Sequence, residues 1–153
     1  MPTQVLFALL PTFFSFTLFL SAGLLFLVEP MIAKMILPLL GGTPAVWNTC
    51  MMFFQAILLG GYGYAHLTGT KTTVNRQIMI HFAVLAAACL VLPIAIPRNW
   101  LPSSEGNPIV YILLMLLISV GLPFFVLSAN SLLLQKWFAG TGHPSAKDPY
   151  FLY

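Results

Sequence analysis

The sequence predicts an all-α integral membrane protein, a bundle of about four transmembrane helices with both termini cytoplasmic. Of 153 residues, 59% are hydrophobic and only 6% are charged, whereas soluble domains carry about 25% charged residues. The mean hydropathy is +0.96. The apolar residues form runs near the ~20 residues needed to cross ~30 Å of hydrocarbon. Three of the six cations, Lys71, Arg76 and Arg98, lie in the loops between these runs.

The first apolar run covers residues 5–40 and contains Pro30. Proline lacks a backbone donor and clashes with the preceding helical turn, so we expect a helix kinked at Pro30. The alternative is that residues 31–40 leave the bilayer and lie along its surface. Residues 1–4 carry no positive side chain, and the run is about twice the usual 7–15 residues of a signal-peptide core. We therefore expect a retained anchor rather than a cleaved signal.

Three more helices follow. The second begins where the hydroxyl of Thr43 can cap a helix and Pro44 can occupy its first turn. The last is expected to bend at Gly121 and Pro123, because both residues disturb a helix interior. The expected ranges are 44–67, 78–96 and 108–138, so that residues 1–138 form the transmembrane domain and residues 139–153 a polar tail leading to a further helix.

The distribution of cations predicts the orientation. With the amino terminus inside, most basic side chains fall on the inner side, which is the pattern of the positive-inside rule. We therefore expect a multi-pass protein of the cell inner (cytoplasmic) membrane. The net charge of +3 is scattered and forms no cluster typical of nucleic-acid binding, so the expected counterparts are anionic lipid headgroups. The expected inner cations are Lys71, Arg76, Lys136 and Lys147, and the outer ones are Arg98 and Lys34.

Glu29 is the one carboxylate within or beside an apolar run. An ionisable side chain in hydrocarbon costs at least ~2.5–3.5 kcal/mol on insertion scales, so it lies either at an interface or in a functional position. One interpretation makes Glu29 a cation or proton site. The other places it at the outer headgroup level or in a structural pair, although Lys34, five positions later, shares its helix face only if the helix kinks.

Three amide side chains are further candidates for a polar site. Asn48 and Gln55 are seven positions apart and share one face of the second helix, and Asn130 lies beside Ser131 in the fourth. These groups could line a cavity together with Glu29 and bind a cationic substrate. The alternative is that they form interhelical hydrogen bonds, which contribute about 0.6 kcal/mol each in measured cases.

Small residues indicate where helices pack. Pairs of small residues four positions apart let two backbones approach closely in lipid, where no hydrophobic force drives association. Such pairs occur at Ala56/Gly60 and Gly61/Ala65 in the second helix and at Ala83/Ala87 in the third. The expected helix-packing residues are Gly60, Gly61, Gly63, Ala83 and Ala87.

Two histidines are expected at the inner interface, His66 at the end of the second helix and His81 at the start of the third. Their matched depth would suit the axial ligation of a haem iron. No other haem feature accompanies them, so we interpret both as histidines at the water boundary.

The sequence carries no recognisable enzyme motif. It has no glycine-rich phosphate loop, no nucleophile elbow, no cluster of metal ligands and no pair of carboxylates for acid–base catalysis. We therefore expect no enzyme activity from this chain on its own, and neither a cofactor nor a metal site.

Two strings in the sequence are specific: GGTPAVWNTC, from residue 41, and GHPSAKDPYFLY, from residue 142. They lie within two longer blocks, residues 19–67 and 120–153. These blocks resemble the membrane half of the spermidine-synthase-like fused proteins, also described as fused major-facilitator/spermidine synthase proteins. The resemblance covers most of the chain apart from the opening residues, the third helix and the loop after it.

The resemblance implies a membrane module truncated before a soluble domain. In that family, membrane helices precede a Rossmann-like domain similar to aminopropyltransferases, whose glycine loop and catalytic aspartates are not in this sequence. We therefore expect a non-catalytic anchor or partner-binding scaffold, whose partners are the lipid bilayer and either other membrane subunits or the missing soluble domain. Two alternatives stay open: an accessory subunit of a larger respiratory or photosynthetic complex, and a half-transporter for a cationic substrate such as a polyamine, using Glu29, Asn48 and Gln55.

Overall fold

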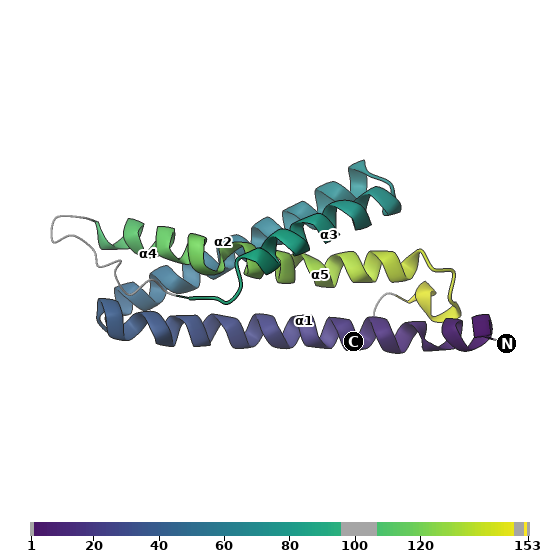
Figure 1. Cartoon of the computed structure of the whole chain (residues 1–153), viewed down its shortest axis with the longest axis horizontal. Coiled ribbons are helices and arrows are strands. Elements are labelled where there is room, and N and C mark those ends of the chain that lie inside the picture. The colour runs from purple at the N-terminus through teal and green to yellow at the C-terminus, as the bar shows by residue number, and fades with distance from the viewer. Residues whose placement is uncertain (1, 96–106, 149–151, 153) are drawn as a thin grey trace.

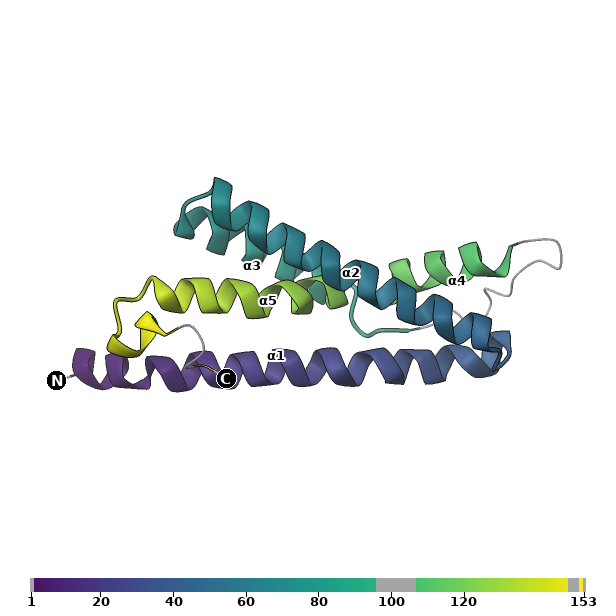
Figure 2. The ribbon, with the colours of Figure 1, turned by 180° about the vertical axis from the view of Figure 1, so that it is seen from behind.

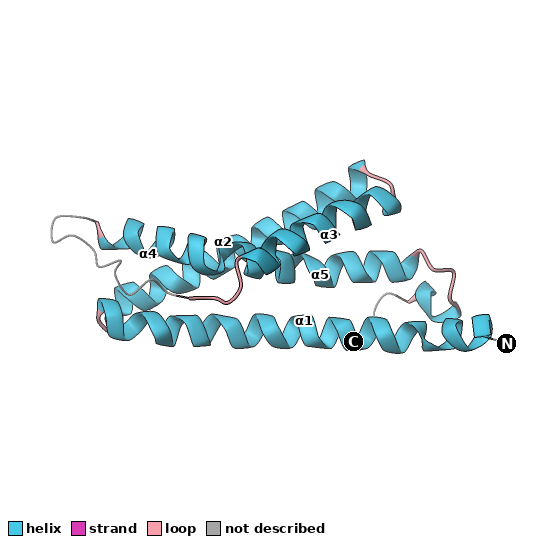
Figure 3. Cartoon of the chain, viewed as in Figure 1, coloured by secondary structure: helices cyan, strands magenta, loops and turns pink. Residues whose placement is uncertain are grey.

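The computed structural model describes residues 2–95, 107–148 and 152, and all regular structure in these residues is helical (Figure 3). Two helical segments are long and apolar enough to cross a membrane, Phe7–Leu40 and Pro108–Ala139. The all-α prediction is thus confirmed for the described residues. The elements are α1 (Pro2–Leu40), α2 (Pro44–Lys71), α3 (Val74–Leu90), α4 (Pro108–Leu116), a π-helical turn η1 (Leu117–Gly121), α5 (Leu122–Ala139) and a 3-10 turn η2 (Pro144–Lys147).

Helix α1 continues through Pro30 rather than ending there, so residues 31–40 stay in the same helix. In Figures 1 and 2 the ribbon of α1 follows one line along its length with no visible kink, whereas we expected one at Pro30. Proline costs one helical hydrogen bond, but buried packing on both sides of it holds the helix together. Val28 precedes Pro30, and Ile32 and Ile36 follow it; all three side chains are buried.

Helix α2 begins as its sequence predicts. The backbone N–H of Val46 donates to Thr43 Oγ1 at 3.4 Å, and Pro44 occupies the first turn. Gly41, in the preceding turn, has φ of +85°, a left-handed conformation that favours glycine. This turn reverses the chain so that α2 runs back beside the other helices.

The ends of α2 and α3 differ from the expected ranges. Helix α2 extends to Lys71 instead of residue 67, and α3 begins at Val74 instead of residue 78. Only Thr72 and Thr73 connect the two helices, so the polar residues on either side of this turn belong to helical turns. The backbone N–H of Thr72 donates to the carbonyl of Thr68 and closes the last turn of α2. Helix α3 ends at Leu90 rather than residue 96, because Pro93 disfavours helical conformation in the residue before it.

A π-helical turn, η1, interrupts the last long helix next to Gly121 and Pro123, the residues at which we expect a bend. Pro123 cannot donate a backbone hydrogen bond, and a wider turn before it accommodates the missing bond. Asn107 caps the start of α4, where its side-chain oxygen accepts from the N–H of Ile109 at 3.0 Å. Helices α4 and α5 therefore follow one another as one interrupted helix.

The main core lies where α1, α2 and α4 meet around η1 and the start of α5. Its side chains are spaced at helical intervals on each element, so each helix buries one stripe. The fully buried members are Ile32, Ile36, Cys50, Phe54, Ile112, Met115, Leu116 and Val120. A smaller cluster of Ala65, Ala129 and Leu133 joins α2 to α5.

Three segments distant in sequence lie at the same end of the molecule in Figure 1: the start of α1, the turn between α2 and α3, and the end of α5. The turn between α1 and α2 and the start of α4 lie at the opposite end. Consequently Lys71, Arg76 and Lys136 belong to one end of the bundle and Lys34 belongs to the other. These four cations are separated in the way that the positive-inside prediction groups them, and Arg98, the other expected outer cation, lies outside the described residues.

Candidate functional site

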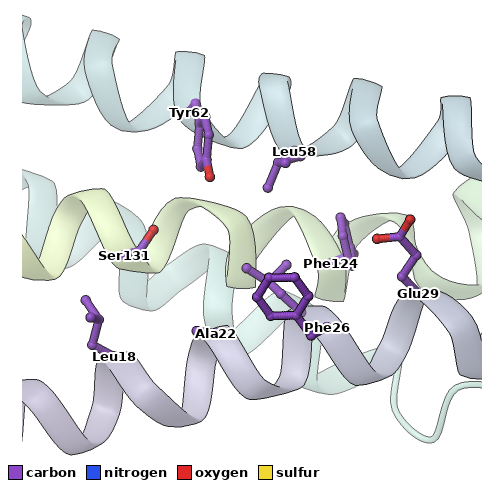
Figure 4. Close-up of a pocket in the computed structure, with 9 residues that line it drawn as sticks. Leu18, Ala22, Phe26, Glu29, Leu58, Tyr62, Phe124 and Ser131 are labelled. Atoms are coloured by element: carbon purple, nitrogen blue, oxygen red, sulfur yellow. The ribbon is translucent and has the colours of Figure 1, made fainter. Parts of the chain in front are cut away.

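A cavity of about 240 Å³ opens between α1, α2 and α5, and Glu29 lies at its edge (Figure 4). In the close-up, the Glu29 carboxylate is at one end of the cavity, and Tyr62 and Ser131 are toward the other. The aromatic rings of Phe26 and Phe124 lie between these ends. The remaining lining residues are Leu18, Ala22, Leu25 and Leu58.

The carboxylate of Glu29 has no hydrogen bond or ion pair with any residue that the structure describes, and Lys34 does not pair with it. In a helix that spans a membrane an unpaired carboxylate would be costly, so such a site would favour either a proton or a cationic ligand at this position. The aromatic walls favour a cation as well, because the face of an aromatic ring attracts positive charge within ~6 Å. The cavity is therefore chemically suited to a small organic cation.

A second polar arrangement connects three helices in the interior. Asn130 on α5 donates through Nδ2 to Ser21 Oγ on α1 at 3.1 Å. Its Oδ1 lies 2.7 Å from His81 Nε2 on α3, which places the donating proton of the imidazole on Nε2. Ser21 and His81 are each only 4% exposed. The three side chains form a hydrogen-bonded chain across the bundle, which we call the Ser21–Asn130–His81 chain.

Aromatic and amide groups extend this arrangement toward the end of α5. The indole Nε1 of Trp137 donates to Gln77 Oε1 at 3.0 Å. The His81 ring stacks with Tyr64 at 6.1 Å between centroids and meets Trp137 edge-on at 5.8 Å. Three buried polar atoms of this group have no hydrogen-bond partner among the described residues: Tyr64 Oη, Gln77 Nε2 and His81 Nδ1.

The amide site predicted from the sequence is not assembled as expected. Asn48 and Gln55 are exposed on α2 and do not line the cavity of Glu29. The reason is that α2 turns the stripe containing Cys50 and Phe54 toward the core, which leaves the amides outside it. Asn130 is half-buried, and its partners are Ser21 and His81 rather than Glu29.

The histidines also differ from expectation. His66 is exposed on α2, as a residue at a water boundary would be. His81 instead is buried and held by Asn130, so the two imidazoles occupy different environments. No group of three or more histidine, cysteine, aspartate or glutamate side chains in the described ranges could hold a metal ion.

The expected helix-packing residues separate into two groups. A Cβ atom on Gly61 would overlap Ser128 Oγ and lie 3.0 Å from the carbonyl oxygen of Phe125, so α2 and α5 approach closely there. A Cβ on Gly60 would make ordinary contact with the Phe125 ring at 3.8 Å. The other three positions, Gly63, Ala83 and Ala87, are exposed, and a Cβ atom on Gly63 would meet nothing within 4 Å.

Sequence reasoning missed Ser21 and Gln77 and assigned His81 to the interface. A usable signal was present: Gln77 and His81 are four positions apart and share one helix face, and the residues from 78 to 90 are apolar apart from His81. Because the expected third helix started at residue 78, Gln77 fell into the predicted loop and this spacing was lost. Ser21 offers no such signal, since a single serine in an apolar run is common.

No protein-family model, curated protein or solved structure matches this chain. The resemblance of residues 19–67 and 120–153 to the spermidine-synthase-like fused proteins therefore stays a proposal.

Proposed function

We propose that this chain is a non-catalytic multi-pass membrane module that acts as an anchor or partner-binding scaffold, comparable to the membrane half of the spermidine-synthase-like proteins. The observation that carries the proposal is the outer side of α1. By helical periodicity, Phe16 and Phe19 lie on the side opposite the buried Val28 and Ile32. Their exposed fractions are 61% and 73%. A helix facing water would carry charged side chains there.

The other helices of the bundle also expose large apolar side chains. Large apolar side chains are also exposed on α2, α3, α4 and η1, with Leu59, Met79 and Phe82 among them. Exposed apolar surface on this scale marks contact with lipid or with another protein. In the proposed topology α1, α2, α3 and the α4–α5 pair each cross the inner membrane of the cell. The α2–α3 turn then lies on the cytoplasmic side.

Cysteine labelling in sealed inverted vesicles tests this topology. In a background with Cys50 and Cys89 replaced by serine, Lys71→Cys reports on the α2–α3 turn and Gly42→Cys on the α1–α2 turn. A membrane-impermeant maleimide should label only Lys71→Cys in inverted vesicles and only Gly42→Cys in intact spheroplasts. Labelling of both positions from one side, or release of the chain from membranes by alkaline carbonate, would contradict the proposal.

The scaffold role has its own test, which also covers the accessory-subunit alternative. Native mass spectrometry of the chain extracted in mild detergent should show it bound to a second polypeptide in fixed stoichiometry. A transferase-like soluble protein as the partner favours the anchor function. Redox or photosynthetic subunits favour the accessory role. Detection of the chain without any bound polypeptide would argue against both roles.

A second candidate function is the binding of an organic cation in the Glu29 cavity, and the unpaired carboxylate is the observation that favours it. Since Asn48 and Gln55 lie outside the cavity, this candidate now rests on Glu29 with Tyr62 and Ser131. Binding of radiolabelled spermidine to the chain in nanodiscs tests it. Glu29→Gln should abolish saturable binding, whereas Gln55→Ala, on the exposed face of α2, should leave it intact. Equal binding by both variants would remove this candidate.

A further inference from the structure

The orientation of the Gln77 amide is fixed by its neighbour. The Trp137 indole can only donate a hydrogen bond, so the atom facing it at 3.0 Å is the carbonyl oxygen of Gln77. The NH₂ group of the amide must therefore point the other way. Gln77 is fully buried, and its Nε2 finds no acceptor among the described residues. A buried amide with unused donors is costly and indicates that an acceptor belongs beside it.

The unused donors of Gln77 face a second donor. A Cβ atom placed on Gly69 would lie 3.4 Å from Gln77 Nε2 and 2.8 Å from Lys136 Nζ, so both nitrogens gather at this glycine. The Lys136 ammonium bonds to the Gly69 carbonyl, which uses one of its three N–H donors. An ammonium and an amide NH₂ thus lie side by side, a combination that attracts an oxyanion rather than a cation or a neutral acceptor.

The surroundings of this pair are positively charged. Lys71 ends α2 two residues after Gly69, and Arg76 immediately precedes Gln77 in α3; both side chains are exposed. The only described carboxylate at this end of the bundle is that of Asp148, after η2. Lys136 is exposed, so an anion can reach its ammonium from outside, and the flexible lysine chain can shift to admit an oxygen atom to Gln77.

We propose that Lys136 and Gln77, flanked by Lys71 and Arg76, bind the phosphate group of an anionic phospholipid at the α2–α3 turn. The inference rests on the proposed membrane function, because a lipid headgroup reaches this site only if the turn lies at a membrane surface. Basic side chains between the ends of neighbouring membrane helices are a general arrangement for headgroup recognition. Gly69 leaves the space that the two donors need.

The test uses the full chain in nanodiscs of phosphatidylcholine containing a minor fraction of phosphatidylglycerol. Native mass spectrometry after release from the discs counts the retained lipids. The wild-type chain should retain phosphatidylglycerol preferentially. Lys136→Gln should lower that preference about fivefold, the effect expected for one cation near a headgroup. Lys34→Gln removes the same charge at the opposite end of the bundle and should leave the preference unchanged.

Further variants separate a built site from simple charge attraction. Gln77→Met removes the amide donors without changing the charge and should also weaken retention. If Gln77→Met does not fold, Gly69→Ala serves instead, because its added methyl group crowds Lys136 Nζ. An equal loss for Lys34→Gln and Lys136→Gln, or full retention in Lys136→Gln, would overturn the proposal.

A further experiment distinguishes a lipid phosphate from free inorganic phosphate as the ligand. Addition of millimolar inorganic phosphate to discs of pure phosphatidylcholine should not protect Lys136 from acetylation by an amine reagent, whereas phosphatidylglycerol should. Protection by inorganic phosphate alone would show an anion site that is not a lipid site and would refute the lipid proposal. Failure of the chain to enter nanodiscs at all would instead refute the proposed membrane function.

Discussion

His81 Nε2 on α3 lies 2.7 Å from Asn130 Oδ1 on α5, and the same Asn130 amide donates to Ser21 on α1. One side chain thus connects three helices that are far apart in the sequence. The partners on both sides are buried, so neither can turn to water when the amide is removed. This relationship makes Asn130 the central polar residue of the interior.

Replacement of Asn130 by leucine should destabilise the fold. It leaves His81 and Ser21 without their partner, and interhelical hydrogen bonds in membranes contribute about 0.6 kcal/mol on average and up to ~1.7. We expect a loss of about 1–2 kcal/mol in reversible unfolding by SDS in mixed micelles. Asn48→Leu is the matched control, because Asn48 is exposed, and should change stability little. Equal stability of both variants would show that the chain of hydrogen bonds is not important.

Gly61→Ala should weaken the packing of α2 on α5. The new Cβ would lie 2.9 Å from Ser128 Cβ and 3.0 Å from the Phe125 carbonyl oxygen, and a helix backbone cannot easily yield. Overpacking of this kind costs about 1–3 kcal/mol, measurable in the same unfolding assay.

Gly63 provides the control for that experiment, because a Cβ added there meets no atom within 4 Å. Gly63→Ala should be neutral or slightly stabilising, since alanine favours a helix by about 1 kcal/mol over glycine. A destabilised Gly63→Ala together with a normal Gly61→Ala would mean that the α2–α5 interface is wrongly assigned.

Thr43→Ala should cost about 1 kcal/mol, the usual effect of removing an N-cap hydroxyl. Thr43 Oγ1 accepts from the N–H of Val46, whereas Thr73, at the start of α3, makes no side-chain cap bond. Thr73→Ala is therefore the control and should leave stability nearly unchanged. The difference between the two threonines isolates the cap from the general effect of losing a hydroxyl.

Ala22→Leu tests the shape of the Glu29 cavity without touching its charge. Ala22 lines the cavity, so a larger side chain should fill part of the 240 Å³ and lower spermidine affinity at least several-fold while Glu29 remains in place. Ala83→Leu adds the same atoms on the exposed side of α3 and should not affect binding. Unchanged affinity in Ala22→Leu would place any cation site elsewhere.

Several features could be predicted from local sequence because they depend on neighbouring residues. The start of α2 follows from Thr43 and Pro44, and the disturbance in the last helix follows from Gly121 and Pro123. Helix ends governed by tertiary packing were less predictable. The polar residues after residue 67 are typical of a loop, yet they continue α2 to Lys71. The reason is that a short turn brings α3 back against α5.

The candidate sites show the same division. Glu29 stood out in the sequence because a carboxylate in an apolar run is costly wherever the helix packs. Asn48 and Gln55 seemed equally suitable, since they share a helix face, but helical periodicity cannot say which face turns inward. That choice depends on how Cys50 and Phe54 pack against the other helices.

The sequence by itself determined that this chain is helical, that its surface is apolar and that its charges concentrate at the ends of the helices, because composition and periodicity act locally. Only the tertiary structure decided which polar groups meet. Asn130 joins Ser21 and His81, and Gln77 joins Trp137 and leaves its NH₂ beside Lys136, because those contacts depend on the relative rotation of separate helices. Successive residues of a helix point about 100° apart, so a rotation of α3 by that angle would exchange buried His81 for exposed Phe82. No local pattern records the rotation.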